Sequence, residues 1–419
     1  MKMSFSGGTI DGTVTSPPSK SHTHRAIFLA SLANGKSALS NCLISDDTLS
    51  TIAAMRSIGA SVETDGDKVL VAGGNLHAPA APVDVGNSGT TLRIFTGIAS
   101  IFNQKVTVTG DESLRNRPME PLLNALTQMG VGCSSDKGKP PVEIKGGSKG
   151  GKVTVDGSIS SQFISSLLVT APMLAEDMEI TVTGKAVSEP YIDVTTYMMR
   201  QFGSDARKEG NVFKVKGGTG YVPQDYFVPA DFSSAAFPLV AGALGGKATV
   251  KGLKLNDPQG DRIIVLVLRE TGALVSFTDD SVTVGKGRLR SMDVDVGWCP
   301  DLFPILAVLL STAEGTSRLH DAPQLRFKES DRIKTTVNML KAIGADASET
   351  DDGCIIRGRR RLKGGVVDNA GDHRIMMAAA VASLVCDNPV VMENSECFSI
   401  SYPDFLDHMR LLGLKADVL

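Results

Sequence analysis

The chain has 419 residues, too many for one hydrophobic core, so the length predicts two or three domains. The formal net charge of −3, with 43 Lys and Arg against 46 Asp and Glu, excludes a protein that binds nucleic acid through overall basicity. The six cysteines form no C-x-x-C pair, which indicates reduced, mostly buried thiols rather than a disulfide framework. No signal peptide, transit peptide or membrane-spanning apolar run is visible, so we expect a cytoplasmic protein.

The first elements are predicted at residues 1–15, where weak alternation indicates a short strand or two. Pro17 and Pro18 then end any preceding element, and Ser19 or Ser21 can cap the apolar helix that follows. Lys20 and Arg25 fall in or beside the start of this helix. Helix N-termini attract anions, so cations at this position indicate an anionic ligand. A solvated helix start with chance basic residues is the alternative.

Five further segments repeat this arrangement of a polar start and a nearly all-apolar helix, which is typical of buried helices. The six starts lie at residues 20, 87, 160, 231, 301 and 372. Asp301 is expected to act either as the N-cap of its helix or as a functional carboxylate.

A second series of helices is amphipathic, and each ends in a glycine suited to the left-handed C′ position. These glycines are Gly59, Gly130, Gly203, Gly272, Gly344 and Gly413. Two series with the same period predict six repeats of about 70 residues. Alternating segments such as residues 105–110 and 179–184 add strands to each repeat, so the unit is α/β.

Six repeats divide naturally into two groups of three, and residues 226–230 are the predicted linker between them. We therefore expect one domain of residues 16–228 and another of residues 1–15 plus 229–419. If the N-terminal strands pair with the last repeats, the chain crosses twice and forms a hinge with a cleft.

Basic residues recur in loops and at helix starts, where a solvated face explains each one singly but explains their recurrence poorly. Arginine suits bidentate recognition of carboxylate and phosphate, so the site should hold several anionic groups. Asp301, Glu329 and His373 are candidate acid–base residues, although His373 could equally be a packed core histidine. No metal-ligand spacing is visible.

Seven motifs, taken together and in this order, resemble the 5-enolpyruvylshikimate-3-phosphate synthase family of enolpyruvyl transferases over nearly the whole chain. They are Lys20-Ser21-x-x-x-Arg25, Gly86-Asn87-Ser88-Gly89-Thr90-x-x-Arg93, Asn116-Arg117-Pro118, Asp156-Gly157-Ser158-x-Ser160-Ser161-Gln162, Ser188-Glu189-Pro190-Tyr191-Ile192-Asp193, Lys328-Glu329-Ser330-Asp331-Arg332 and Asp372-His373-Arg374.

The resemblance implies two similar domains of three βαβαββ units joined by two crossovers, with the active site in the cleft between them. It implies transfer of the enolpyruvyl group of phosphoenolpyruvate to the 5-hydroxyl of shikimate 3-phosphate, with release of phosphate and without cofactor or metal. A monomer is the expected state, and neither nucleic acid nor a membrane is an expected partner.

The resemblance also implies roles for individual residues. Lys20, Asp301 and Glu329 would be catalytic. Shikimate 3-phosphate would be held by Lys20, Ser21, Arg25, Ser160, Ser161, Gln162, Ser188, Tyr191, Asp301, Gln324 and Lys328. Phosphoenolpyruvate would be held by Lys20, Gly89, Arg117, Gln162, Arg332 and Arg374.

Two positions depart from the family pattern. Gln324 stands where many members have Asn, and Ile400 stands where some members have Lys, which removes one expected phosphoenolpyruvate contact. Gly89 leaves room beside phosphoenolpyruvate, so we expect inhibition by its mimic glyphosate.

Two alternatives stay open. The first is the related transferase that acts on UDP-N-acetylglucosamine, although Cys133 lacks that enzyme's Arg-Pro loop. The second is a non-catalytic repeat protein that only binds phosphorylated metabolites. An RNA-end cyclase would need a nucleotide-accepting histidine and a more basic surface, and neither is apparent.

Overall fold

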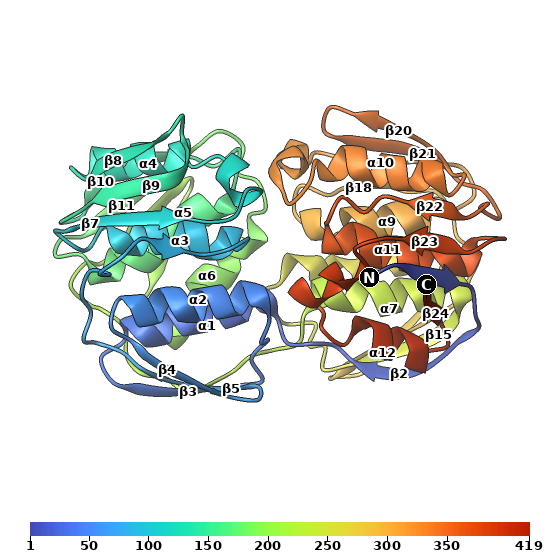
Figure 1. Cartoon of the computed structure of the whole chain (residues 1–419), viewed down its shortest axis with the longest axis horizontal. Coiled ribbons are helices and arrows are strands. Elements are labelled where there is room, and N and C mark those ends of the chain that lie inside the picture. The colour runs from blue at the N-terminus through green and yellow to red at the C-terminus, as the bar shows by residue number, and fades with distance from the viewer. The chain divides into compact units, whose positions relative to one another are not determined.

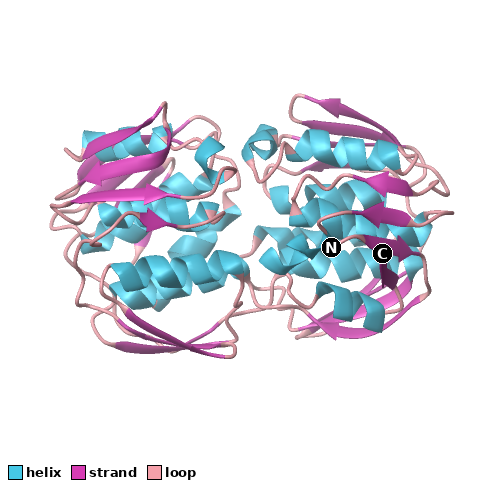
Figure 2. Cartoon of the chain, viewed as in Figure 1, coloured by secondary structure: helices cyan, strands magenta, loops and turns pink.

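The structure is a computed structural model that describes residues 1–419. The chain divides into a continuous unit, Pro18–Val228, and a discontinuous unit in which Met1–Pro17 joins Pro229–Leu419. The colour gradient of Figure 1 follows the chain through both units. Within each unit, the strands lie on the outside and the helices on the inside (Figure 2).

The helices form two series, as the sequence predicts. The buried series consists of α1 (Lys20–Leu32), α3 (Gly89–Ala99), α5 (Ser161–Thr170), α7 (Phe232–Gly245), α9 (Phe303–Leu310) and α11 (His373–Ala382). The amphipathic series consists of α2 (Asp46–Ser57), α4 (Glu120–Gln128), α6 (Pro190–Gln201), α8 (Ile264–Glu270), α10 (Arg332–Ala342) and α12 (Phe405–Leu411). Short 3-10 helices are η1 (Leu114–Asn116), η2 (Ala171–Met173), η3 (Gly260–Ile263), η4 (Pro300–Leu302), η5 (Pro323–Phe327), η6 (Ser383–Val385) and η7 (Ser395–Ile400).

The six glycines that follow the amphipathic helices all have positive φ, from 79° at Gly203 to 108° at Gly413. This confirms that they end their helices in a conformation that other residues rarely adopt. Polar caps are present at five of the six predicted starts, where Ser19, Ser88, Ser160, Asp231 and Asp372 accept backbone N–H groups, and at the second start the cap is the residue after position 87. No helix combines the length and the apolar composition that a membrane span requires.

Every repeat builds one four-stranded mixed sheet with one parallel pair and two antiparallel pairs. In the continuous unit the sheets are β14 (Tyr226–Phe227)–β3 (Lys36–Ser40)–β5 (Lys68–Ala72)–β4 (Ser61–Asp65), β6 (Val83–Asp84)–β7 (Lys105–Thr109)–β9 (Lys139–Lys145)–β8 (Gly132–Asp136) and β10 (Gly151–Asp156)–β11 (Met178–Thr183)–β13 (Val212–Val215)–β12 (Ala206–Glu209). In the discontinuous unit they are β2 (Ile10–Thr15)–β15 (Gly246–Lys251)–β17 (Ser281–Gly285)–β16 (Leu274–Phe277), β18 (Asp293–Asp295)–β19 (Thr316–His320)–β21 (Gly353–Arg357)–β20 (Asp346–Thr350) and β22 (Gly365–Val367)–β23 (Val390–Met392)–β1 (Met3–Ser6)–β24 (Lys415–Val418).

Three strands complete sheets that lie far from them in the sequence. β14 pairs with β3 of the first repeat, with Tyr226 opposite Leu39, so residues 226 and 227 form a strand rather than a free linker. β2 pairs with β15 of the fourth repeat, and β1 lies between β23 and β24 of the sixth. The N- and C-termini therefore lie in the same sheet (Figure 1).

Each unit has its own hydrophobic core, built from its buried helices and the inner faces of its sheets. The polar starts of the buried helices and the loops before the amphipathic helices contain the candidate functional residues.

Candidate active site

In the continuous unit, the predicted residues come from the starts of α1, α3, α5 and α6 and from the loop after η1. Lys20 is the first residue of α1, and its Nζ donates to Asp47 Oδ2 at 2.8 Å. Burial works against ionisation of Asp47, but Lys20 and His24 together hold its pKa well below the usual range. Asp47 was not among the predicted site residues. Its sequence signal, the pair Asp46-Asp47, is that of an ordinary acidic helix start.

Arg25 is a buried cation whose partners are all neutral. Its Nε donates to Thr195 Oγ1 at 2.8 Å, its Nη1 to the Ser21 carbonyl at 3.0 Å and its Nη2 to the Tyr191 carbonyl at 3.1 Å. Burial lowers the pKa of Arg25 to about 10. An uncompensated buried cation costs folding free energy, which an anionic ligand would recover.

Gln162 joins the starts of α3 and α5. Its Oε1 accepts from Arg93 Nη1 at 2.7 Å, and its Nε2 donates to Thr90 Oγ1 at 2.9 Å. Ser160 caps α5, and Ser161 is the first residue of that helix. The amide of Gln162 is thus oriented by both neighbours, and the sequence did not indicate the Arg93–Gln162 bond.

Gly89 and Arg117 lie against each other at the start of α3. Arg117 is 6% exposed, and its Nη2 donates to Asn87 Oδ1 at 3.1 Å. A Cβ atom at Gly89 would meet Arg117 Nη1 at 2.5 Å, closer than Cβ atoms are found. The absence of a side chain at Gly89 is therefore what admits the guanidinium. Ser188 has a φ of 53° and lies just before α6, which contains Tyr191.

In the discontinuous unit, Arg332 is the centre of a cluster of carboxylates. It is 1% exposed, and its Nη1 donates to Asp301 Oδ1 at 2.9 Å. Nη2 donates to Glu329 Oε2 at 2.6 Å, and Nε donates to Asp372 Oδ2 at 3.0 Å. These three carboxylates raise the pKa of Arg332 against the effect of burial, so the guanidinium is charged at any working pH.

Asp301 is shared between two arginines, because Arg374 Nη2 donates to Asp301 Oδ2 at 2.9 Å. Burial opposes the charge, but Arg374, Lys328 and Arg332 hold the pKa of Asp301 well below the usual range. Of the two alternatives for Asp301, the N-cap is wrong, because Asp301 lies in η4 while the N-cap position of α9 is Leu302. Its oxygens bond guanidinium groups instead.

Three other predicted positions lie in the same unit. Gln324 in η5 is 3% exposed, and its Oε1 is buried without a hydrogen-bond partner. His373 is 1% exposed, in agreement with the packed-core alternative. Ile400 is the last residue of η7. Asp261, which the sequence analysis missed, is 2% exposed and bonds Ser233 at the start of α7.

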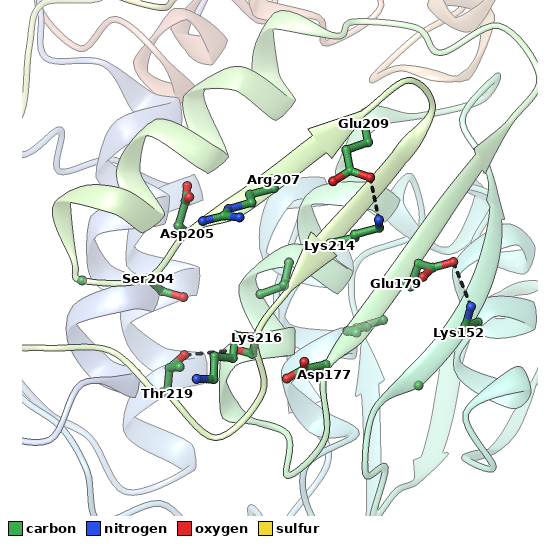
Figure 3. A pocket seen from close by; sticks show the side chains of 14 residues that line it. Lys152, Asp177, Glu179, Ser204, Asp205, Arg207, Glu209, Lys214, Lys216 and Thr219 are labelled. Carbon is green, nitrogen blue, oxygen red and sulfur yellow. Dashed lines mark hydrogen bonds and ion pairs between the residues drawn. The ribbon is translucent and has the colours of Figure 1, made fainter.

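The depression shown in Figure 3 is a contrasting feature of the continuous unit. It has a volume of about 760 Å³ and lies on the sheet of β10, β11, β13 and β12. Its charges pair with one another, as in Lys152–Glu179 at 3.3 Å and Lys214–Glu209 at 2.5 Å. Lys152 and Lys214 are exposed to solvent, unlike the buried Arg25 and Arg332, so this depression shows no buried cation that an anionic ligand would compensate.

The fold is a sixfold α/β repeat. The site residues described above, in the continuous and in the discontinuous unit, place cations and carboxylates at helix starts, and together these features define the class of protein. Comparison with known families sharpens this class. The chain matches the family "EPSP synthase (3-phosphoshikimate 1-carboxyvinyltransferase)" over residues 6–409. The chain therefore belongs to the EPSP synthase family.

Similar proteins cover almost the whole chain. The 3-phosphoshikimate 1-carboxyvinyltransferase of Methanocorpusculum labreanum is 46% identical over 416 residues, 99% of each chain. That of Methanocaldococcus jannaschii is 42% identical over 98% of this chain and 97% of its own. A solved EPSP synthase structure from Acinetobacter baumannii matches with a TM-score of 0.83 and 30% identity, covering 100% of both chains. The predicted α/β fold class is thereby confirmed.

Proposed function

We propose that this chain is a 3-phosphoshikimate 1-carboxyvinyltransferase of the shikimate pathway. It transfers the enolpyruvyl group of phosphoenolpyruvate to the 5-hydroxyl of shikimate 3-phosphate by addition and elimination, and it releases phosphate. The observation that carries this proposal is the cluster in which Arg332 and Arg374 share Asp301, with Glu329 beside them. Such a cluster supplies both an anion site and two proton-transfer groups.

Shikimate 3-phosphate would be held by residues of both units. Arg25 and Ser21 of α1, Ser160 to Gln162 of α5, and Ser188 and Tyr191 around the start of α6 would bind it, together with Lys20. The neutral surroundings of Arg25 support a role in binding phosphate or carboxylate. Lys328, Asp301 and Gln324 would complete the set. The buried, unpartnered Oε1 of Gln324 supports an interaction with a hydroxyl donor.

Phosphoenolpyruvate would be held by Lys20, Gly89, Arg117, Gln162, Arg332 and Arg374. Arginine suits both of its anionic groups, because the guanidinium can form two parallel hydrogen bonds. Lys20 would bridge the two substrates and stabilise the departing phosphate with its positive charge.

The proton transfers would involve Asp301 and Glu329. Addition needs a base at the attacking hydroxyl and an acid at the methylene carbon, and elimination reverses these roles. In the free protein, arginines keep Asp301 a weak proton acceptor. A phosphoenolpyruvate anion on Arg332 and Arg374 would compete for these guanidinium groups and make Asp301 more basic.

The alternative transferase acting on UDP-N-acetylglucosamine would need a reactive thiolate. Cys133 is in strand β8, and burial raises the pKa of its thiol, which is the opposite of activation. We therefore propose the shikimate reaction in preference to this alternative.

The deciding experiment is phosphate release from shikimate 3-phosphate and phosphoenolpyruvate. We expect release only when both substrates are present, and a fall of about 10²- to 10⁴-fold in Glu329→Gln. Glu314→Gln is the matched control, since Glu314 is an exposed carboxylate that also pairs with an arginine. Release from one substrate alone, or full activity of Glu329→Gln, would contradict the proposal.

We further propose a cytoplasmic monomer that is inhibited by glyphosate. Sedimentation of the purified protein at micromolar concentration tests the monomer, and fractionation of the host cell tests the compartment. Full turnover in millimolar glyphosate would contradict the inhibition.

A further inference from the structure

A chain of polar contacts runs from Lys20 through the interior of the continuous unit to the start of α3. In order, its members are Lys20, Asp47, His24, Thr51, Thr91 and Ser88. The His24 Nδ1–Thr51 Oγ1, Thr51 Oγ1–Thr91 Oγ1 and Ser88 Oγ–Thr91 Oγ1 distances are each 2.6 Å. His24, Thr51 and Thr91 are 0% exposed, so these hydrogen bonds do not compete with bulk water.

The direction of each hydrogen bond in this chain of polar contacts follows from the contact between His24 and Asp47 at its end. His24 Nε2 and Asp47 Oδ1 are both buried, neither has a hydrogen-bond partner, and they lie 3.5 Å apart. Two lone pairs facing each other there would repel, whereas a proton on Nε2 points toward the carboxylate. With that proton on Nε2, Nδ1 of a neutral imidazole can only accept.

The remaining protons are then determined one after another. Thr51 must donate to His24 Nδ1, Thr91 must donate to Thr51, and Ser88 must donate to Thr91. Ser88 Oγ in turn accepts the Thr91 backbone N–H, at 3.3 Å, as the cap of α3. Every hydroxyl in the chain thus uses its single proton once, and all the donors point toward Asp47.

We propose that this ordered chain positions Lys20: neutral His24, with its proton on Nε2, and the hydroxyls of Thr51, Thr91 and Ser88 fix the Asp47 carboxylate that holds the Lys20 ammonium. Asp47, His24, Thr51 and Thr91 are positioning residues, because they act through Lys20. The chain also ties Lys20 to the helix start that contains Gly89, so two parts of the proposed phosphoenolpyruvate site are held in one geometry. The second statement rests on the proposed function, whereas the proton positions do not.

The first test reads the His24 tautomer in the unmodified protein without substrates. Histidine labelled with ¹⁵N is incorporated, and the His24 signals are assigned by their loss in His24→Gln. We expect a protonated Nε2 and an unprotonated Nδ1 at neutral pH, with the pKa of His24 below its usual range, because burial lowers it while Lys20 and Arg25 oppose the effect of Asp47. A proton on Nδ1, or a His24 pKa at or above the usual range of histidine, would overturn the proposal and leave the proposed function untouched.

The second test removes one hydroxyl from the middle of this chain of polar contacts. Thr51→Val removes the hydroxyl that His24 needs and touches neither Lys20 nor the substrates. We expect kcat/KM for phosphoenolpyruvate to fall about fivefold, the effect of one net hydrogen bond on the transition state. Thr51→Ser keeps the hydroxyl and should restore the rate.

Thr96→Val is the matched control. Thr96 is also 0% exposed, and its hydroxyl donates only to the Leu92 carbonyl of its own helix, α3. It should lose stability to the same degree as Thr51→Val while keeping the kinetics of the unmodified protein. Because Thr51 and Thr91 are links of one chain, the Thr51→Val/Thr91→Val double variant should lose little more activity than either single variant. Equal kinetics of Thr51→Val and Thr96→Val, or additive losses in the double variant, would overturn the proposal.

Discussion

Two fully buried arginines, one in each unit, have opposite surroundings. Arg25 in the continuous unit donates to two hydroxyls and to two backbone carbonyls, and burial lowers its pKa to about 10. Arg332 in the discontinuous unit donates to Asp301, Glu329 and Asp372, and these carboxylates raise its pKa. Burial alone therefore does not determine whether the charge of an arginine is compensated within the protein.

The difference separates two uses of a buried charge. A cation with neutral partners lowers stability in the free protein and gains most from an anionic ligand. A cation among three carboxylates is compensated before any ligand arrives, and it tunes those carboxylates as much as it binds. Removing Arg25 should therefore cost mainly binding, whereas removing Arg332 should cost mainly stability.

Arg332→Met should have the largest effect. It leaves Asp301, Glu329 and Asp372 without their shared cation, and a broken buried ion pair costs about 3–5 kcal/mol. Urea unfolding should show this loss of stability. The matched control is Arg288→Met, which breaks the exposed Arg288–Glu314 pair of 2.7 Å and should cost less than about 1 kcal/mol. Equal losses in the two variants would contradict the comparison.

Arg25→Met should have the next largest effect, and it should appear in binding. The affinity for shikimate 3-phosphate, measured by calorimetry, should fall by about 100-fold or more, while the free energy of unfolding stays the same or increases. Arg56→Met is the control, because Arg56 is exposed and its guanidinium also has only a neutral partner, the carbonyl of Val62. A destabilised Arg25→Met protein with unchanged affinity would mean that Arg25 is structural.

Gly89→Ala tests a third arginine, Arg117, by displacing it. The new Cβ would meet Arg117 Nη1 at 2.5 Å, so the guanidinium must move away from the start of α3. We expect KM for phosphoenolpyruvate to rise about tenfold, with a smaller change in kcat, as expected when one charge-assisted hydrogen bond is weakened. Gly132→Ala in β8 is the control, since its nearest neighbours would be 3.6 Å away. Unchanged KM in Gly89→Ala would exclude a contact of Arg117 with this substrate.

Asp261→Asn should have the smallest effect on activity, because its effect is on the pH dependence of stability. Burial is the main cause and the charge of Asp301 the second cause that raise the pKa of Asp261 to about 7. The pKa of an Asp in the unfolded chain is about 3.9. Between these values the native state keeps a proton that the unfolded state has released, so stability falls as pH rises. The Asn variant should flatten this fall, whose slope is at most about 1.4 kcal/mol per pH unit.

Urea unfolding at pH 4.5, 5.5 and 6.5 would measure the effect, with the exposed Asp279→Asn variant as control. A curve of the same slope in Asp261→Asn and in the unmodified protein would show that Asp261 is ionised like the three carboxylates around Arg332.

The sequence predicted the repeats because their signals are local. A capping side chain, an apolar helix and a terminal glycine each act within a few residues, so Ser88 and Gly203 could be assigned from their neighbours alone. The strand β14 was missed because it has only two residues and pairs with β3, far away in the sequence. The N-cap alternative for Asp301 stayed open for a related reason, since its partners Arg332 and Arg374 are distant in the chain.

The sequence by itself determined the sixfold α/β repeat, the positions of its helix starts and the types of charged residue placed there. Only the tertiary structure decided which charges are compensated: Asp47 for Lys20, three carboxylates for Arg332 and none for Arg25. Caps and periodicity depend on the local backbone, whereas ion pairing depends on which helix starts the folded sheets bring together.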